Sequence, residues 1–101
     1  MVKQSRNRER GKAVEKEIAR MFNGKRVGIL GSEDVSCEKY SLEVKSRKRF
    51  VGDKWMRQCI KNNRENKIPL VVVHQANSPH TKDLVMINIM DFLKVTGVKN
   101  E

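Results

Sequence analysis

The sequence predicts an α/β fold in a single domain, with a mixed central β-sheet flanked by helices. Two segments carry apolar residues at helical spacing, and the segments around them have the alternation or the β-branched content of strands. The second helical segment separates two predicted strands, which favours a crossover between parallel neighbours. A length of 101 residues provides for one modest core, so one domain is expected.

The N-terminal part is predicted to be a basic arm followed by a helix. Residues 1–10 are polar and basic, and we expect them to form a flexible arm. A helix is expected over 12–22, because four apolar residues share one of its faces: Val14, Ile18, Met21 and Phe22. Gly24 is suited to the left-handed position that ends a helix.

A short strand and a β-hairpin are predicted next. The strand is expected over 26–30, and the hairpin over 34–47 with its turn centred on Glu38-Lys39. Residues 40–45 alternate between apolar and polar side chains, as in a half-buried strand.

Four further elements complete the predicted fold: a helix over 54–66, a strand over 68–73, a strand over 84–89 and a helix over 92–95. Asp53 and Asp91 precede the two helices and can cap their first turns. The uninterrupted apolar run in 68–73 indicates a strand that is buried on both faces.

The composition points to a polyanion as partner. The formal net charge is +10, and nucleic acid is the commonest partner of so basic a domain. A ribosomal-type or DNA-coating protein and a protein of acidic membrane surfaces share this charge. No apolar run approaches the ~20 residues that span a bilayer, and no secretory signal is expected. Cys37 and Cys59 are predicted to be reduced thiols, so we expect an intracellular protein, in the cytoplasm or at the nucleoid.

A group of charged residues in the hairpin indicates chemistry. Glu43 and Lys45 lie two positions apart, so a strand places both on one face, ~7 Å apart. A turn at Glu38-Lys39 sets Asp34 directly opposite Glu43, with Cβ atoms ~5 Å apart. Carboxylates held so close repel each other unless a cation lies between them. Oxygen ligands suit Mg²⁺, with Mn²⁺ as a substitute, better than zinc.

These residues match the requirements of phosphodiester hydrolysis. A divalent ion polarises the phosphate and lowers the pKa of a bound water. Asp34 and Glu43 would hold that ion. Lys45 would act on the water or the phosphate, either as a general base or as a charge clamp. The alternative interpretation is an ordinary solvated Glu-x-Lys pair.

Asp34 followed by Glu43-Val44-Lys45 resembles the D…(D/E)xK signature of the PD-(D/E)xK, or restriction-endonuclease-like, nucleases. Gly11-Lys12-Ala13-Val14-Glu15 looks like the G-x-x-x-E of the first helix of archaeal-type Holliday junction resolvases. The stretch 43–47 resembles their E-(V/C)-K-S motif. The similarity runs from about Arg10 to Val95. It implies a restriction-endonuclease-like sheet within a nuclease domain over 11–101.

The resemblance also implies further site residues. Glu15 would be another acidic member of the metal site, although periodicity alone does not choose it over Glu17. Ser32 would lie near the scissile phosphate, and Gln58 would support Lys45 or the water. The alternatives are a turn residue for Ser32 and an ordinary surface residue for Gln58.

Several basic residues are expected to bind DNA phosphates beside this site. Together with Ser32, the predicted nucleic-acid-binding residues are Arg6, Arg8, Arg10, Lys12, Arg47, Lys48 and Arg49. A plain solvated charge run is the alternative for 45–49. His74 and His80 have no second ligand at a suitable spacing, so both are predicted to be structural or exposed.

The expected function is therefore that of a Mg²⁺-dependent endodeoxyribonuclease in DNA recombination and repair. The resemblance implies a homodimer that resolves four-way junctions by paired nicks. The segments from Gly31-Ser32 to Asp34 and from Asp34 to Glu43 are shorter than in typical resolvases. A repair or phage endonuclease for flaps, forks or duplex DNA therefore fits as well. A non-catalytic nucleic-acid-binding module and a basic structural protein are the alternatives from other classes.

Overall fold

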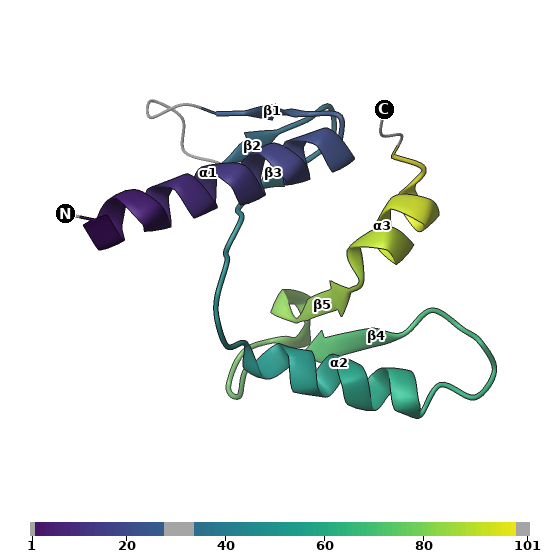
Figure 1. Ribbon diagram of the computed structural model, residues 1–101. Helices are drawn as coiled ribbons and strands as arrows, with labels where there is room; N and C mark the ends of the chain where they lie inside the picture. The colour runs from purple at the N-terminus through teal and green to yellow at the C-terminus, as the bar shows by residue number, and fades with distance from the viewer. Residues whose placement is uncertain (1, 28–33, 99–101) are drawn as a thin grey trace. The chain divides into compact units, whose positions relative to one another are not determined.

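The computed structural model describes residues 2–27 and 34–98 (Figure 1), with side chains from residue 9 onward. The chain divides into two compact units. The first unit comprises Met1–Arg47 and Gly97–Glu101, and the second comprises Lys48–Thr96. The described residues form helices and two small antiparallel sheets, which confirms the predicted α/β class. No helix in this part of the chain is long and apolar enough to cross a membrane.

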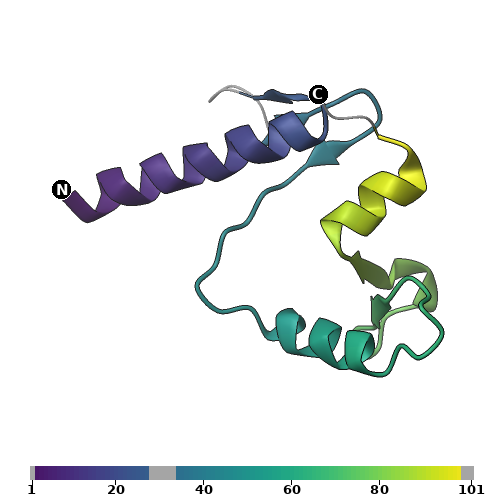
Figure 2. The same cartoon turned by 45° about the vertical axis from the view of Figure 1, so that its right-hand side comes forward.

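The first unit consists of a long helix and a three-stranded antiparallel sheet. Its elements are α1 (Val2–Met21), β1 (Lys25–Arg26), β2 (Val35–Ser36) and β3 (Ser41–Leu42), with β2 in the middle of the sheet. Helix α1 packs against β1 and β2, and it lies along the sheet in both views (Figures 1 and 2). Ala19, Phe22 and Val35 are buried between the helix and the sheet. The Phe22 ring meets the Tyr40 ring edge-on at 6.4 Å.

Helix α1 begins earlier than the sequence predicts. The helix starts at Val2 rather than at residue 12, so the segment predicted as a separate basic arm is its first part. The predicted strand over 26–30 corresponds to β1 only in part, because residues 28–30 lie outside the described residues.

The end of α1 corrects the prediction for Gly24. The left-handed residue is Asn23, at a φ of 53°, and asparagine tolerates this conformation better than most residues. Gly24 is required for a different reason. A Cβ at this position would lie 2.5 Å from the Ser36 carbonyl oxygen, so only glycine lets the chain pass so close to β2.

The second unit consists of two helices, a short 3-10 helix and a two-stranded sheet. Its elements are α2 (Val51–Lys61), β4 (Leu70–Val73), η1 (His80–Lys82), β5 (Leu84–Ile87) and α3 (Ile89–Thr96). β4 and β5 pair antiparallel from Leu70↔Ile87 to Val73↔Leu84. Helix α2 packs against β4.

The predicted crossover to a parallel strand is wrong. The strand that follows α2 pairs with β5, and both sheets of the described residues are antiparallel, so they contain no mixed sheet. The prediction that residues 68–73 are buried on both faces is wrong too. Leu70 and Val72 are 47% and 62% exposed, whereas Val71 and Val73 are half-buried. A single helix packed on β4 covers only one face of a two-stranded sheet.

Two predicted helix caps are also corrected. α3 begins at Ile89, and Asn88 is its cap, because Asn88 Oδ1 accepts a hydrogen bond from the Met90 amide at 2.9 Å. Asp91 lies inside the first turn. α2 begins at Val51 after Phe50, which makes no side-chain cap, and Asp53 lies within the helix. The Asp53 carboxylate instead pairs with Arg57, one turn further along.

Candidate active site at the β2–β3 hairpin

The register of the β2–β3 hairpin is the one that the sequence predicts. Val35 pairs with Leu42 and Ser36 with Ser41. The Cys37 amide donates to the Tyr40 carbonyl at 3.1 Å, so the turn is centred on Glu38-Lys39. The ladder ends at Val35↔Leu42, and Asp34 and Glu43 are the next residues on its two arms. The Asp34 amide bonds to the Leu42 carbonyl, so the regular pairing does not continue to Asp34 and Glu43, which the sequence predicts as a cross-strand pair.

Asp34 is held in place by backbone hydrogen bonds on both sides. Its amide donates to the Leu42 carbonyl at 2.9 Å, and its carbonyl accepts from the Val27 amide at 3.0 Å. Its carboxylate Oδ2 accepts from the Val44 amide at 2.6 Å. Asp34 is therefore fixed directly before β2, and its side chain bonds to the segment that carries Glu43.

Glu43 and Lys45 lie in the segment after β3, because the strand that the sequence predicts through residue 45 ends at Leu42. Their side chains are 56% and 61% exposed, whereas Leu42 and Val44 between and beside them are half-buried. Lys45 Nζ lies 2.8 Å from Glu43 Oε2. An ion pair this exposed contributes little to stability. Its significance is positional, because it places a lysine ammonium at a carboxylate of the segment to which Asp34 bonds.

The structure distinguishes Glu15 from Glu17, which periodicity could not do. Glu15 is half-buried, and its carboxylate pairs with Arg26 of β1 at an Nε–Oε1 distance of 3.0 Å. Glu17 is exposed and pairs with Arg20 on the same helix. The hydrogen bond from Arg20 lowers the pKa of Glu17 below its usual value. Glu15 thus faces the sheet, and Glu17 lies on the solvent side of α1.

The acidic residues of the predicted metal site have separate partners. Glu15 pairs with Arg26, Asp34 with the Val44 amide and Glu43 with Lys45. Within residues 9–27 and 34–98, Glu15, Asp34 and Glu43 do not form a group whose ligand atoms all lie within 4.8 Å of one another. The side chains therefore have to exchange partners before all three could bind one ion.

The remaining predicted site residues are distributed over both units. Gln58 is an exposed residue of α2, in the second unit. Arg10 and Lys12 are exposed on α1. Exposed basic residues occupy the strand-free segment that joins the two units: Arg47, Lys48 and Arg49. Ser32 and the side chains of Arg6 and Arg8 lie outside the described residues.

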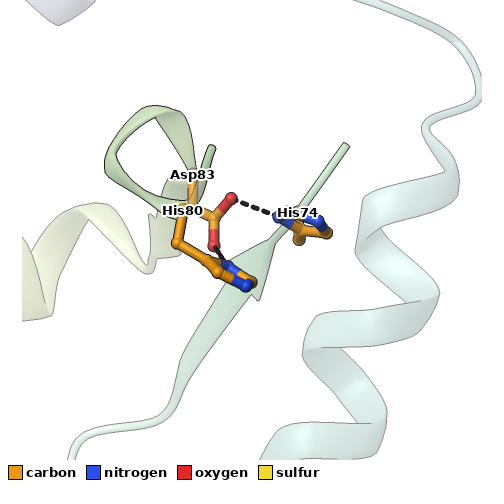
Figure 3. Close-up of polar contacts among 3 residues, drawn as sticks. All are labelled: His74, His80 and Asp83. Carbon is orange, nitrogen blue, oxygen red and sulfur yellow. Dashed lines mark hydrogen bonds and ion pairs between the residues drawn. The ribbon is translucent and has the colours of Figure 1, made fainter. Parts of the chain in front are cut away.

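One group of potential ligands was missed by the sequence analysis. His74 and His80 both bond to Asp83 (Figure 3), with Nδ1 to carboxylate distances of 2.6 Å and 3.0 Å. Both histidines are exposed, as predicted, but the structure brings each of them to a carboxylate that the sequence analysis did not pair with them. The group could have been found from the sequence if the strands on either side of the two histidines had been predicted to pair antiparallel. The ladder that ends at Val73↔Leu84 sets His74 opposite Asp83 at the next position.

Comparison of this chain with protein-family models, curated proteins and solved structures finds no match. The similarity to the PD-(D/E)xK nucleases therefore rests on the motif residues themselves. Of these, Asp34, Glu43, Lys45 and Glu15 all belong to the first unit, and each has a described position on α1 or the hairpin.

Proposed function

We propose that this protein is a Mg²⁺-dependent endodeoxyribonuclease whose active site is the end of the β2–β3 hairpin away from its turn. The observation that supports the proposal is that Asp34 bonds to the backbone on both sides of Glu43, whose carboxylate in turn pairs with Lys45. The ligand atoms would be carboxylate oxygens, and the Glu43 side chain is 56% exposed to solvent. Mg²⁺ prefers oxygen ligands and keeps several of its bound waters, so it suits such a site. When bound, Mg²⁺ would supply Lewis-acid polarisation of the phosphate and a more acidic water.

The chain's own residues then have distinct tasks. Asp34 and Glu43 would hold the ion, and the Val44 amide fixes the Asp34 carboxylate in its orientation. Lys45 pairs with Glu43 in the structure. If Glu43 held the ion instead, the Lys45 ammonium would be available to the phosphate, where it could orient a water and balance developing charge. Glu15 can join only after it leaves Arg26.

The net charge of +10 supports DNA as the substrate, because a phosphodiester backbone attracts a basic surface without regard to sequence. Four-way junctions are the finer part of the proposal, and structure-selective cleavage of flaps or forks is its alternative. The support for junctions is the likeness of 11–15 and 43–47 to the resolvase motifs. A homodimer belongs to the same proposal, since two equivalent sites match a two-fold substrate.

A second candidate function is a non-catalytic DNA-binding module in this fold. One observation favours it: each acidic side chain of the site already has its own partner among the described residues. Such a module would use the same basic surface but would have no need of Asp34 or Glu43.

Cleavage of labelled DNA tests the proposal against this second candidate. The substrates are a four-way junction, a flap, a linear duplex and a single strand, each incubated with Mg²⁺ or with EDTA. Asp34→Asn keeps an oxygen for the Val44 amide and Glu43→Gln keeps the side-chain shape, so both variants should fold. Each is expected to lose at least about a hundredfold in cleavage rate while still binding DNA.

Glu38→Gln is the matched control, because Glu38 is an exposed glutamate at the turn of the same hairpin. It should cut at the wild-type rate. Paired symmetric nicks on the junction support the resolvase proposal, whereas metal-dependent cleavage of flaps or duplex supports the wider nuclease proposal alone. Tight binding without cleavage of any substrate in Mg²⁺ or Mn²⁺ would establish the binding module instead.

A further inference from the structure

The loop between β4 and β5 brings two imidazoles and a carboxylate together. His74 directly follows β4, Asp83 directly precedes β5, and His80 begins the short helix η1 between them. The β4–β5 register, continued one residue past Val73↔Leu84, accounts for the contact of His74 with Asp83. The hairpin therefore fixes two of the three residues, and η1 brings in the third.

Both histidines present the same ring atom to one carboxylate. His74 Nδ1 lies 2.6 Å from Asp83 Oδ1, and His80 Nδ1 lies 3.0 Å from Asp83 Oδ2. An ionised carboxylate only accepts hydrogen bonds, so each Nδ1 donates to Asp83 in the tautomer whose ring proton is on Nδ1. The two rings stack with centroids 4.3 Å apart (Figure 3). The Asp83 side chain is only 16% exposed, so it sits at the inner end of the group, whereas His80 is 84% exposed.

We propose that His74, His80 and Asp83 bind a divalent transition-metal ion of the Zn²⁺ class. Two imidazole nitrogens and one carboxylate oxygen are a ligand set of that class, whereas Mg²⁺ prefers oxygen alone. The three ligand atoms already lie within 4.8 Å of one another. Zinc binds nitrogen at about 2.0–2.1 Å, so one ion can reach all three after small side-chain movements.

The ion would take the place of the two hydrogens now shared with Asp83. A neutral imidazole keeps its single proton, which moves from Nδ1 to Nε2, and an imidazolium releases one proton to solvent. Metal affinity therefore falls on acidification. The rings are inclined at 29°, so coordination by both nitrogens requires one ring to turn. His80 can make this rotation because it is almost fully exposed.

Three protein ligands leave a fourth position for a water or another ligand, as in sites that are not purely structural. The site is separate from the proposed Mg²⁺ site in chemistry and in sequence, so it does not depend on nuclease activity. A bound ion would also link the two ends of the loop between β4 and β5. Because the three ligands come together only in the folded protein, ion binding should raise the melting temperature.

The test is a Zn²⁺ titration of the full chain without a histidine tag, followed by NMR of the imidazole signals. The chain has only two histidines, so two single variants assign both signals. Both imidazoles should respond together and saturate at one ion per chain. Mg²⁺ at the same or higher concentration should move neither signal. A response of one imidazole alone, or of neither, would overturn the proposal.

Variants then separate the three ligands from other zinc-binding groups. His80→Asn and Asp83→Asn should each weaken Zn²⁺ binding by about tenfold or more. Thr81→Ala, an exposed change in the same helix η1, is the matched control and should bind as the wild type does. Cys37 and Cys59 are free thiols, so a Cys37→Ser/Cys59→Ser variant is included. Retained affinity in His80→Asn, or affinity lost in the cysteine variant, would contradict the site.

Discussion

Asp34 bonds to the backbone on both sides of Glu43: its amide donates to the Leu42 carbonyl, and its carboxylate accepts from the Val44 amide. Each of these two carboxylates has its own partner, the Val44 amide for Asp34 and the Lys45 ammonium for Glu43. A divalent cation would have to bind both carboxylates in place of the Lys45 ion pair.

The Val44 amide makes Asp34 a structural residue as well as a proposed ligand. Asp34→Ala removes the acceptor and leaves a half-buried amide without this bond, so it should lower the free energy of unfolding by about 1–3 kcal/mol. Asp34→Asn retains an acceptor oxygen and should cost less than the alanine change. Urea unfolding of both variants measures the difference. Equal losses in the two variants would show that the hydrogen bond contributes nothing.

Two glycines in the first unit should respond to alanine in opposite ways. A Cβ at Gly24 would meet the Ser36 carbonyl oxygen at 2.5 Å, so Gly24→Ala should destabilise the unit by about 1–3 kcal/mol. Gly11 lies within α1 and a Cβ there meets nothing within 4 Å. Gly11→Ala should therefore stabilise the protein by about 0.5–1 kcal/mol, because alanine favours the helix. Thermal unfolding of the two variants checks both signs.

The hairpin at the candidate site was predictable because its signals are local. Alternation over 40–45 and a turn at Glu38-Lys39 suffice to set the register, and the structure has that register. The boundaries of the helices were less predictable. Asp53 and Asp91 are good cap residues, but Phe50 and Asn88 occupy the cap positions. Asn88 directly follows β5, so α3 begins where that strand ends.

The group around Asp83 could not be predicted while β4 was expected to pair with a parallel strand. Long-range pairing is not encoded in the periodicity of a single strand, and a helix between two strands favours a crossover only on average. Once β4 and β5 form a hairpin, His74 falls opposite Asp83 by register alone.

The cap of α3 gives a prediction about the second unit. Asn88 Oδ1 accepts hydrogen bonds from the Met90 and Asp91 amides, so Asn88→Ala should cost about 1 kcal/mol in the free energy of unfolding. Asn88→Ser keeps an oxygen that can cap the helix and should lose less. Chemical denaturation of the two variants makes the comparison. A serine variant as unstable as the alanine variant would indicate that the asparagine acts in another way.

The basic segment between the two units should contribute to DNA binding through phosphates. Lys48 and Arg49 are exposed and lie in a strand-free segment directly after the hairpin that carries Glu43 and Lys45. If both contact phosphates, Lys48→Ala/Arg49→Ala should weaken binding and make the slope of log K against log salt less negative by about 0.9 per lost contact. Fluorescence anisotropy of labelled duplex at several salt concentrations measures the slope. Lys94→Ala, an exposed change on α3, is the control for loss of net charge. If the control changes the slope by the same amount per lost charge, the effect would come from the net charge of the protein and not from phosphate contacts of this segment.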